Sequence, residues 1–228
     1  MEFLSRYDRN KPLITEEGQR LLSGCTAAVA GLGGLGGEIA EQLARLGFGK
    51  LILIDCDVTD VTNLNRQLLA TEDSIGVHKT ETARQRLNSV NSGVKLSVRA
   101  ERIDERNALD LLSGADIVLD ALDNLPSRRI LVGACRELGI PVVHGAIGGW
   151  YGQVSFILPG DDTLDRLYPT GDEVSGFAGA GAPAFLPPIV ASVQTAQAVK
   201  WRLGLGGLLA GQVLYMDLLR HSFNIVTL

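Results

Sequence analysis

Short apolar runs alternate along the chain with segments whose apolar residues recur at helical spacing. The apolar runs end beside glycine or aspartate, which is typical of buried parallel strands. The predicted strands cover residues 27–30, 51–54, 94–100, 117–119 and 141–143. The predicted helices cover residues 38–46, 77–90, 104–112 and a segment opened by Pro126. This alternation predicts an α/β fold with a doubly wound, mostly parallel Rossmann-like sheet.

The pattern changes after residue 150. Residues 151–158 alternate like an antiparallel strand, whereas residues 159–188 show no clear element, which favours a functional or mobile loop. A helix over 189–203 and strands over 212–216 and 223–226 follow. We therefore expect a C-terminal antiparallel extension, and 228 residues fit one domain. Its nucleotide-binding part would cover about 20–150, with a crossover loop and C-terminal part over about 151–228.

Net charge, the N-terminal sequence, the length of apolar runs and the cysteine content exclude several classes of protein. With 21 Lys and Arg against 26 Asp and Glu, the net charge of −5 argues against direct binding of nucleic acid or of an anionic membrane. The charged N-terminus does not resemble a signal peptide, and no apolar run is long enough for a membrane span. Cys25, Cys56 and Cys135 form neither a disulfide framework nor a CxxC pair. We expect a cytoplasmic protein.

A glycine-rich loop separates the first predicted strand from the first predicted helix. Its glycines let the backbone approach a phosphate, and the helix N-terminus offers free N–H donors. An acid that ends the second strand can accept hydrogen bonds from ribose hydroxyls, and Asp55 lies 19 residues after the loop. The pattern predicts nucleotide binding but fits a dehydrogenase equally well. The loop glycines are Gly31, Gly33, Gly34 and Gly36.

Charged residues near the ends of later strands favour a nucleoside triphosphate. Arg66 and Lys79 follow the second strand, and Asp123 follows the fourth. A dehydrogenase has no need of this set, whereas a polyphosphate needs cations and its Mg²⁺ needs a carboxylate. We therefore expect ATP and Mg²⁺ as cofactors.

The same segments resemble the ThiF/MoeB/HesA family, the bacterial relatives of ubiquitin-activating enzymes. The resemblance covers nearly the whole chain and rests on the motifs RYDR, GLGGLG, TNLNRQ, GVHK and LDALDN. It implies one adenylating domain over residues 1–228. The implied reaction is attack of a carboxylate on the α-phosphorus of ATP, which releases pyrophosphate and leaves an acyl adenylate. The implied partner is a ubiquitin-like sulfur carrier ending in Gly-Gly, similar to ThiS or MoaD, in molybdopterin or thiamine biosynthesis.

Carried over position by position, the resemblance implies a role for each site residue. Asp55 would hold the ribose and Asp123 the Mg²⁺. Arg9 would reach the triphosphate from the partner subunit of a homodimer. The phosphates would contact Asn63, Arg66 and Lys79, and the nucleotide site would also include Asp57, Gln67 and Asn124. No general base is needed, because a carboxylate is already ionised at pH 7.

Several of these residues also have ordinary structural interpretations. Asn124 is well placed to cap the helix opened by Pro126. Asp57 and Asp120 are equally consistent with solvated loop residues and with a supporting role. A cation is unfavourable at a helix start, so a phosphate partner explains Lys79 better than simple exposure. His144 follows an apolar strand and is expected to be a packed core residue.

The chain departs from MoeB-like relatives in its cysteines. Thr163 and Arg166 stand where the first zinc-binding CxxC pair is expected, and no cysteine follows Cys135. The loop cysteine expected near Phe177 is missing as well. We therefore expect no zinc and no covalent sulfur chemistry, with all three cysteines buried. Adenylation of a small-molecule or tRNA-bound carboxylate, a nucleotide-binding scaffold and a redox protein remain as alternatives.

Overall fold

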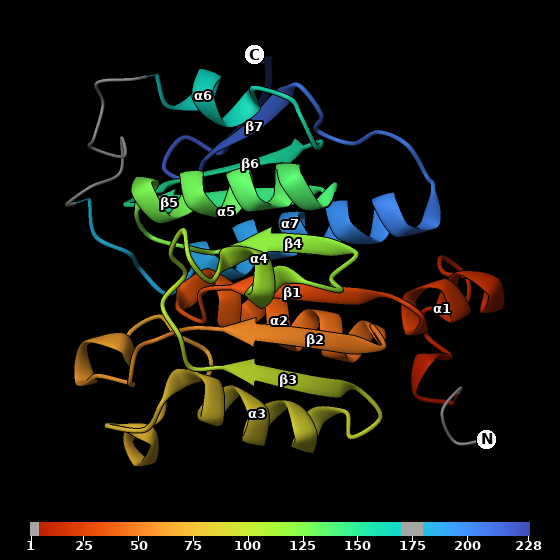
Figure 1. Ribbon diagram of the computed structural model, residues 1–228, viewed down its shortest axis with the longest axis vertical. Helices are drawn as coiled ribbons and strands as arrows, with labels where there is room; N and C mark the ends of the chain where they lie inside the picture. The colour runs from red at the N-terminus through yellow and green to blue at the C-terminus, as the bar shows by residue number, and fades with distance from the viewer. Residues whose placement is uncertain (1–4, 170–179) are drawn as a thin grey trace.

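The computed structural model describes residues 5–169 and 180–228 and centres on an eight-stranded sheet (Figure 1). The strand order is β3-β2-β1-β4-β5-β6-β7-β8. The first five strands are parallel to one another, and β6, β7 and β8 continue the sheet in antiparallel fashion, as predicted. The strands are β1 (Thr26–Ala30), β2 (Lys50–Ile54), β3 (Lys95–Arg99), β4 (Ile117–Asp120), β5 (Val142–Gly148), β6 (Tyr151–Ile157), β7 (Gln212–Asp217) and β8 (Ser222–Thr227).

Helices cover both faces of the sheet and bury two apolar cores. One core packs against α1 (Glu16–Ser23), α2 (Gly34–Leu46), α3 (Lys79–Val90) and α7 (Leu186–Leu203). The other packs against α4 (Ala108–Leu112), α5 (Leu125–Leu138) and α6 (Thr163–Leu167). Short 3₁₀ turns are η1 (Ser5–Tyr7), η2 (Val61–Asn63) and η3 (Glu72–Ser74). The right-handed crossovers of such a sheet leave the carboxyl ends of its parallel strands along one edge.

The glycine loop is itself the start of α2, which begins at Gly34 rather than at the predicted residue 38. A Cβ on Gly36 would lie 1.8 Å from the carbonyl oxygen of Gly31, so only glycine allows the first turn to pack this closely. Gly31 also has φ of +88°, which a side chain would disfavour. The helix N-terminus is thereby placed directly at the end of β1.

Three other predictions of element boundaries were wrong. The expected helix over 104–112 begins at Ala108, because Asp104 and Asn107 accept hydrogen bonds from each other's backbone N–H. The last helix begins at Leu186, with Pro187 and Pro188 accommodated in its first turn. The segment 159–188 does contain an element, the short helix α6.

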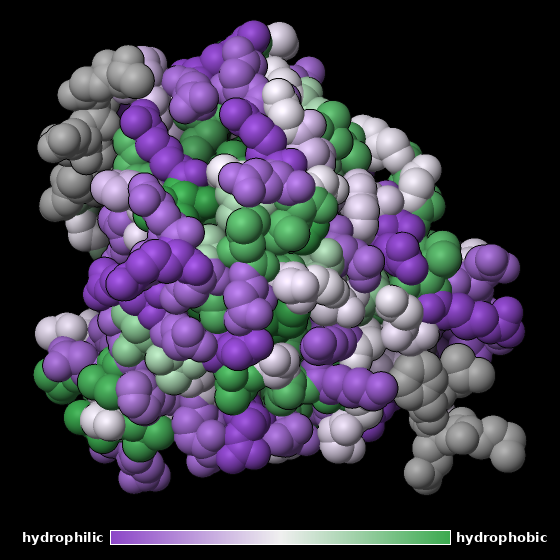
Figure 2. Space-filling model, viewed as in Figure 1, coloured by the Kyte–Doolittle hydropathy of each residue, from purple (hydrophilic) through white to green (hydrophobic). Residues whose placement is uncertain are grey.

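The face of the molecule that carries α4 and α5 is mixed in polarity. Figure 2 shows hydrophilic and hydrophobic residues interspersed over the face that carries α4 and α5. Among the described residues, every helix is too short or too polar to cross a lipid bilayer.

Candidate nucleotide-binding site

A cavity of about 590 Å³ opens at the carboxyl ends of β1, β2 and β4. Its size lies within the usual range for small-molecule sites, about 300–1,000 Å³. Eleven predicted site residues line it: Gly31, Gly33, Gly34, Asp55, Asp57, Asn63, Arg66, Gln67, Lys79, Asp123 and Asn124. Gly36 and Arg9 do not, because Gly36 serves the packing of α2 and Arg9 lies in the N-terminal segment.

Asp55 joins the end of β2 to the glycine loop. Its Oδ2 accepts a hydrogen bond from the backbone N–H of Leu32 at 2.6 Å, and its Oδ1 accepts from that of Asp57 at 2.7 Å. Burial raises the pKa of Asp55, although these two backbone donors oppose the shift. Asp55 lines the cavity, and each of its carboxylate oxygens can accept a further hydrogen bond, as binding of ribose hydroxyls would require.

Lys79 has a partner within the protein. Its Nζ lies 3.0 Å from Oδ2 of Asp57, and its side chain is only 10% exposed. The sequence offered simple exposure or a phosphate partner for this cation, and the structure adds a third explanation, the ion pair with Asp57. A phosphate contact of Lys79 stays a prediction. Lys79 in turn holds the pKa of Asp57 below its usual value. Asp57 thus supports Lys79 and is not merely a solvated loop residue.

The segment after η2 supplies another cation of the cavity, Arg66. The guanidinium of Arg66 donates to the carbonyl oxygen of Thr62 at 2.9 Å and to Oδ1 of Asn65 at 2.8 Å. In the part of the chain that the structure describes, no carboxylate pairs with Arg66. Asn63 accepts from the N–H of Asp60, which fixes the turn. The charge of Arg66 is therefore available to an anion in the cavity.

Asn124 and Asp123 have different roles: Asn124 caps a helix, and Asp123 presents a carboxylate to the cavity. Asn124 caps α5 by accepting from the N–H of Ser127 at 2.9 Å, and its amide donates to Oδ1 of Asp123 at 3.1 Å. The exposed carboxylate of Asp123 faces the cavity. A Cβ on Gly31 would lie 2.7 Å from the carbonyl oxygen of Ala121, so the loop after β4 touches the glycine loop.

The donor set fits Mg²⁺. Mg²⁺ typically binds one or two carboxylates together with substrate phosphates and water, and Asp123 offers such a carboxylate. Asp55, Cys56 and Asp57 also lie close enough together to be considered as a metal group among the described residues. Their carboxylates already bind Leu32 and Lys79, however, so Asp123 is the better candidate.

Comparison with known proteins places this site in context. The family model described as the ThiF family matches residues 7–228. The chain belongs to the ThiF family. The SAMP-activating enzyme E1 of Haloferax volcanii is 35% identical, over 98% of this chain and 84% of that protein. The sulfur carrier protein adenylyltransferase of Thermus thermophilus is 36% identical, over 99% of this chain and 88% of that protein.

A solved structure of similar fold contains ATP. It is the complex of the E. coli tRNA N6-threonylcarbamoyladenosine dehydratase with ATP, and it matches with a TM-score of 0.76 and 25% identity. The match covers 90% of this ThiF-family chain and 96% of that chain.

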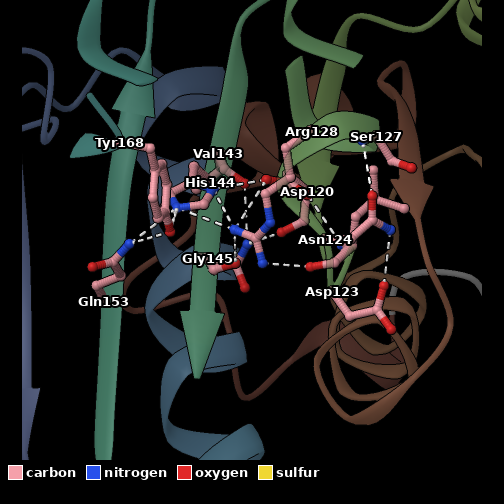
Figure 3. Close-up of polar contacts among 12 residues, drawn as sticks. Asp120, Asp123, Asn124, Ser127, Arg128, Val143, His144, Gly145, Gln153 and Tyr168 are labelled. Atoms are coloured by element: carbon pink, nitrogen blue, oxygen red, sulfur yellow. Dashed lines mark hydrogen bonds and ion pairs between the residues drawn. The ribbon is translucent and has the colours of Figure 1, made fainter. Parts of the chain in front are cut away.

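Sequence reasoning missed Arg128, which also lines the cavity. Arg128 is buried on the inner stripe of α5, together with Leu125, Leu131 and Cys135. The signal was available, because helical spacing places this arginine among apolar residues. Figure 3 shows it in a polar cluster with Asp120 and His144. His144 is fully buried, as predicted, but its neighbours are polar.

The cysteines differ from one another. Cys25 and Cys135 are buried, as predicted, and burial raises the pKa of each thiol to about 12. The prediction for Cys56 was wrong, because its side chain is half-buried and lines the cavity between Asp55 and Asp57. The position near Phe177 lies outside the described residues.

Arg9 lies far from the cavity of its own chain. It is an exposed residue two positions after Tyr7, which lines a second cavity at the amino ends of β1, β2 and β3. Figure 1 shows this N-terminal segment beside α1, at the side of the sheet opposite the strand arrowheads. A role for Arg9 at the nucleotide therefore requires a second chain.

Proposed function

We propose that this protein is an ATP-dependent adenylyltransferase that activates the C-terminal glycine of a ubiquitin-like sulfur carrier protein. One observation carries the proposal: Arg66, Lys79 and Asp123 face a single cavity at the N-terminus of α2. Cations and a carboxylate around a helix N-terminus suit a triphosphate with its metal. The names of the Haloferax and Thermus relatives support the choice of acceptor.

The residues perform the reaction by positioning and by neutralising charge. An oxygen of the acceptor carboxylate forms a bond to the α-phosphorus as the bond to the β-phosphate oxygen breaks. Asp55 orients the ribose, and Asn63, Arg66 and Lys79 stabilise charge on the leaving pyrophosphate. Asp123 would hold Mg²⁺, which when bound neutralises charge on the phosphates. No proton has to be removed, because the attacking carboxylate is ionised at pH 7.

The remaining parts of the proposal concern assembly and metals. The chain acts as one adenylating domain, and the working form is a homodimer in which Arg9 reaches the partner's cavity. Zinc is not a cofactor, since Thr163 is buried and Arg166 pairs with Asp162 where a cysteine pair would be needed. Elemental analysis of the purified protein checks this last point.

The test is exchange of labelled pyrophosphate into ATP, with a ubiquitin-like carrier ending in Gly-Gly as acceptor. The protein should catalyse exchange with the intact carrier but not with one that lacks the terminal glycine. Asp123→Ala should abolish exchange while the protein stays folded, whereas Asp110→Ala, which removes an exposed carboxylate of α4, should not. Exchange that depends on a small molecule or on tRNA would overturn the carrier assignment. ATP binding without any exchange would indicate a scaffold.

A further inference from the structure

A buried charge network of Asp120, Arg128 and His144 lies beside the loop that carries Asp123 (Figure 3). Asp120 ends β4 with no exposed surface, and its Oδ2 lies 3.6 Å from Nη1 of Arg128 and 2.7 Å from Nδ1 of His144. Its Oδ1 accepts from the backbone N–H of Leu122 at 3.0 Å. A buried carboxylate satisfied on both oxygens holds its surroundings in one arrangement.

The protonation of this network follows from its neighbours. Burial opposes ionisation of Asp120, but Arg128 and His144 outweigh it and hold the pKa of Asp120 below its usual value. Burial and the charge of Arg128 lower the pKa of His144, so its ring is neutral. Nδ1 therefore carries the proton that Asp120 accepts, and Nε2 accepts from Tyr168, whose oxygen lies 3.2 Å away. The oxygen of Tyr168 accepts in turn from Gln153.

Arg128 connects this network to the cavity. Its guanidinium donates to the carbonyl oxygen of Leu122 and, at 3.1 Å, to that of Gly145. Leu122 is thus held at its N–H by Asp120 and at its carbonyl by Arg128. The next residue is Asp123, whose other neighbour, Asn124, is held by the cap of α5. The backbone on both sides of the Asp123 carboxylate is therefore anchored.

We propose that Arg128 is a positioning residue that, with Asp120, holds the Asp123 carboxylate in place for the metal-bound triphosphate. A lysine cannot replace it, because one ammonium lacks the planar fork that reaches Leu122, Gly145 and Asp120 together. Misplacing a reacting group by about 1 Å can cost about 100-fold in rate. The inference rests on the proposed adenylation and assigns Arg128 a role that acts through the loop after β4.

The test compares Arg128→Lys with Arg129→Lys, a matched control. Arg129 is the next residue on α5 and also donates to a backbone carbonyl, that of Tyr168, but it does not line the cavity. We expect Arg128→Lys to lower the turnover rate of pyrophosphate exchange about 10- to 100-fold and the control to change it little. Combined with Asp123→Asn, Arg128→Lys should cost little more, because both variants remove the same contribution.

Two readouts do not depend on turnover. Mn²⁺ affinity in the presence of a non-hydrolysable ATP analogue, followed by electron paramagnetic resonance, should fall in Arg128→Lys by about the factor seen in Asp123→Asn. Hydrogen exchange of the Leu122 amide should become faster in Arg128→Lys, with global stability retained. If Arg128→Lys does not fold, the pair Asp120→Asn with Arg128→Gln removes both charges together and avoids an uncompensated buried ion. This double variant should fold, and its pyrophosphate exchange should remain slow.

The outcomes separate this inference from the proposed function. Absence of exchange by the unaltered protein contradicts the adenylation, and the Mn²⁺ and hydrogen-exchange measurements then decide the role of Arg128 alone. Exchange by the unaltered protein together with full activity of Arg128→Lys, or of the neutral pair, overturns the positioning role. Losses in Arg128→Lys and Asp123→Asn that simply multiply would show that Arg128 does not act through Asp123.

Discussion

The ammonium of Lys79 and the carboxylate of Asp57 lie 3.0 Å apart, so the cation predicted to contact phosphate is already paired in the protein. Asp57 lies in the loop after β2, and Lys79 is the first residue of α3. Both residues line the cavity, so the negative charge of Asp57 also lies where the triphosphate would bind. The two residues therefore act as one unit.

This pairing predicts an unusual order of ATP affinities. Lys79→Met should weaken ATP binding by about 10- to 100-fold, because a charge-assisted contact is lost and Asp57 is left to repel the phosphates. Adding Asp57→Asn should restore part of that loss, because it removes the unpaired carboxylate. Isothermal titration calorimetry measures the three dissociation constants. Lys95→Met, at the start of β3, serves as control, and a double variant that binds ATP more weakly than Lys79→Met would contradict the argument.

Cysteine labelling should report on nucleotide binding. Cys56 lines the cavity, whereas Cys25 and Cys135 are buried and have pKa values near 12, so both remain protonated and inert. Burial and Asp57 also raise the pKa of Cys56, so its alkylation should be slow. Iodoacetamide should modify Cys56 alone, and Mg-ATP should block the reaction. Peptide mass spectrometry measures both effects, and labelling of Cys56 that ATP leaves unchanged would place the nucleotide elsewhere.

Mixed dimers test the role of Arg9. Arg9→Ala and Asp123→Ala should each abolish exchange, since each removes one component of a shared site. After subunit exchange, mixed dimers should recover activity, because one of their two cavities contains both residues. Native mass spectrometry establishes that mixed dimers form. If they form and stay inactive, Arg9 does not act across the interface.

Glu41 should make stability depend on pH. Its side chain, on α2, is 8% exposed and lies 2.8 Å from Arg86 and 2.6 Å from Arg45. These partners, Arg86 foremost, lower the pKa of Glu41 in the folded protein, so its stabilising effect is present above the pKa of the unfolded chain and is lost as pH falls. Glu41→Gln should reduce the free energy of unfolding by about 1–3 kcal/mol at neutral pH.

Chemical denaturation over a range of pH measures that difference. It should shrink as pH falls through the lowered pKa of Glu41, and the exposed variant Glu105→Gln should show little effect at any pH. A difference between Glu41→Gln and the unaltered protein that stays constant from neutral to acidic pH would rule out the ion pairs as its cause.

The sequence by itself determined the order of the strands and of all helices but the short α6, because each strand is a local apolar run and each longer helix a local period. It also located the glycine loop and eleven residues of the cavity, though not Arg128, because the carboxyl ends of parallel strands meet at one edge whatever the side chains do. The start of α2 was missed because it depends on a contact between Gly36 and Gly31 across the turn, which no local pattern reveals.

Only the tertiary structure decided which charges compensate one another. Lys79 pairs with Asp57, 22 positions earlier in the sequence, and Asp120 pairs with His144, 24 positions later on the neighbouring strand. The same is true of Arg128. Its place on an apolar helix stripe is explained by the carboxylate at the end of β4 and by two carbonyl oxygens, one in the loop after β4 and one in β5. Coulombic and hydrogen-bonding energies depend on distance and burial, which sequence separation does not determine.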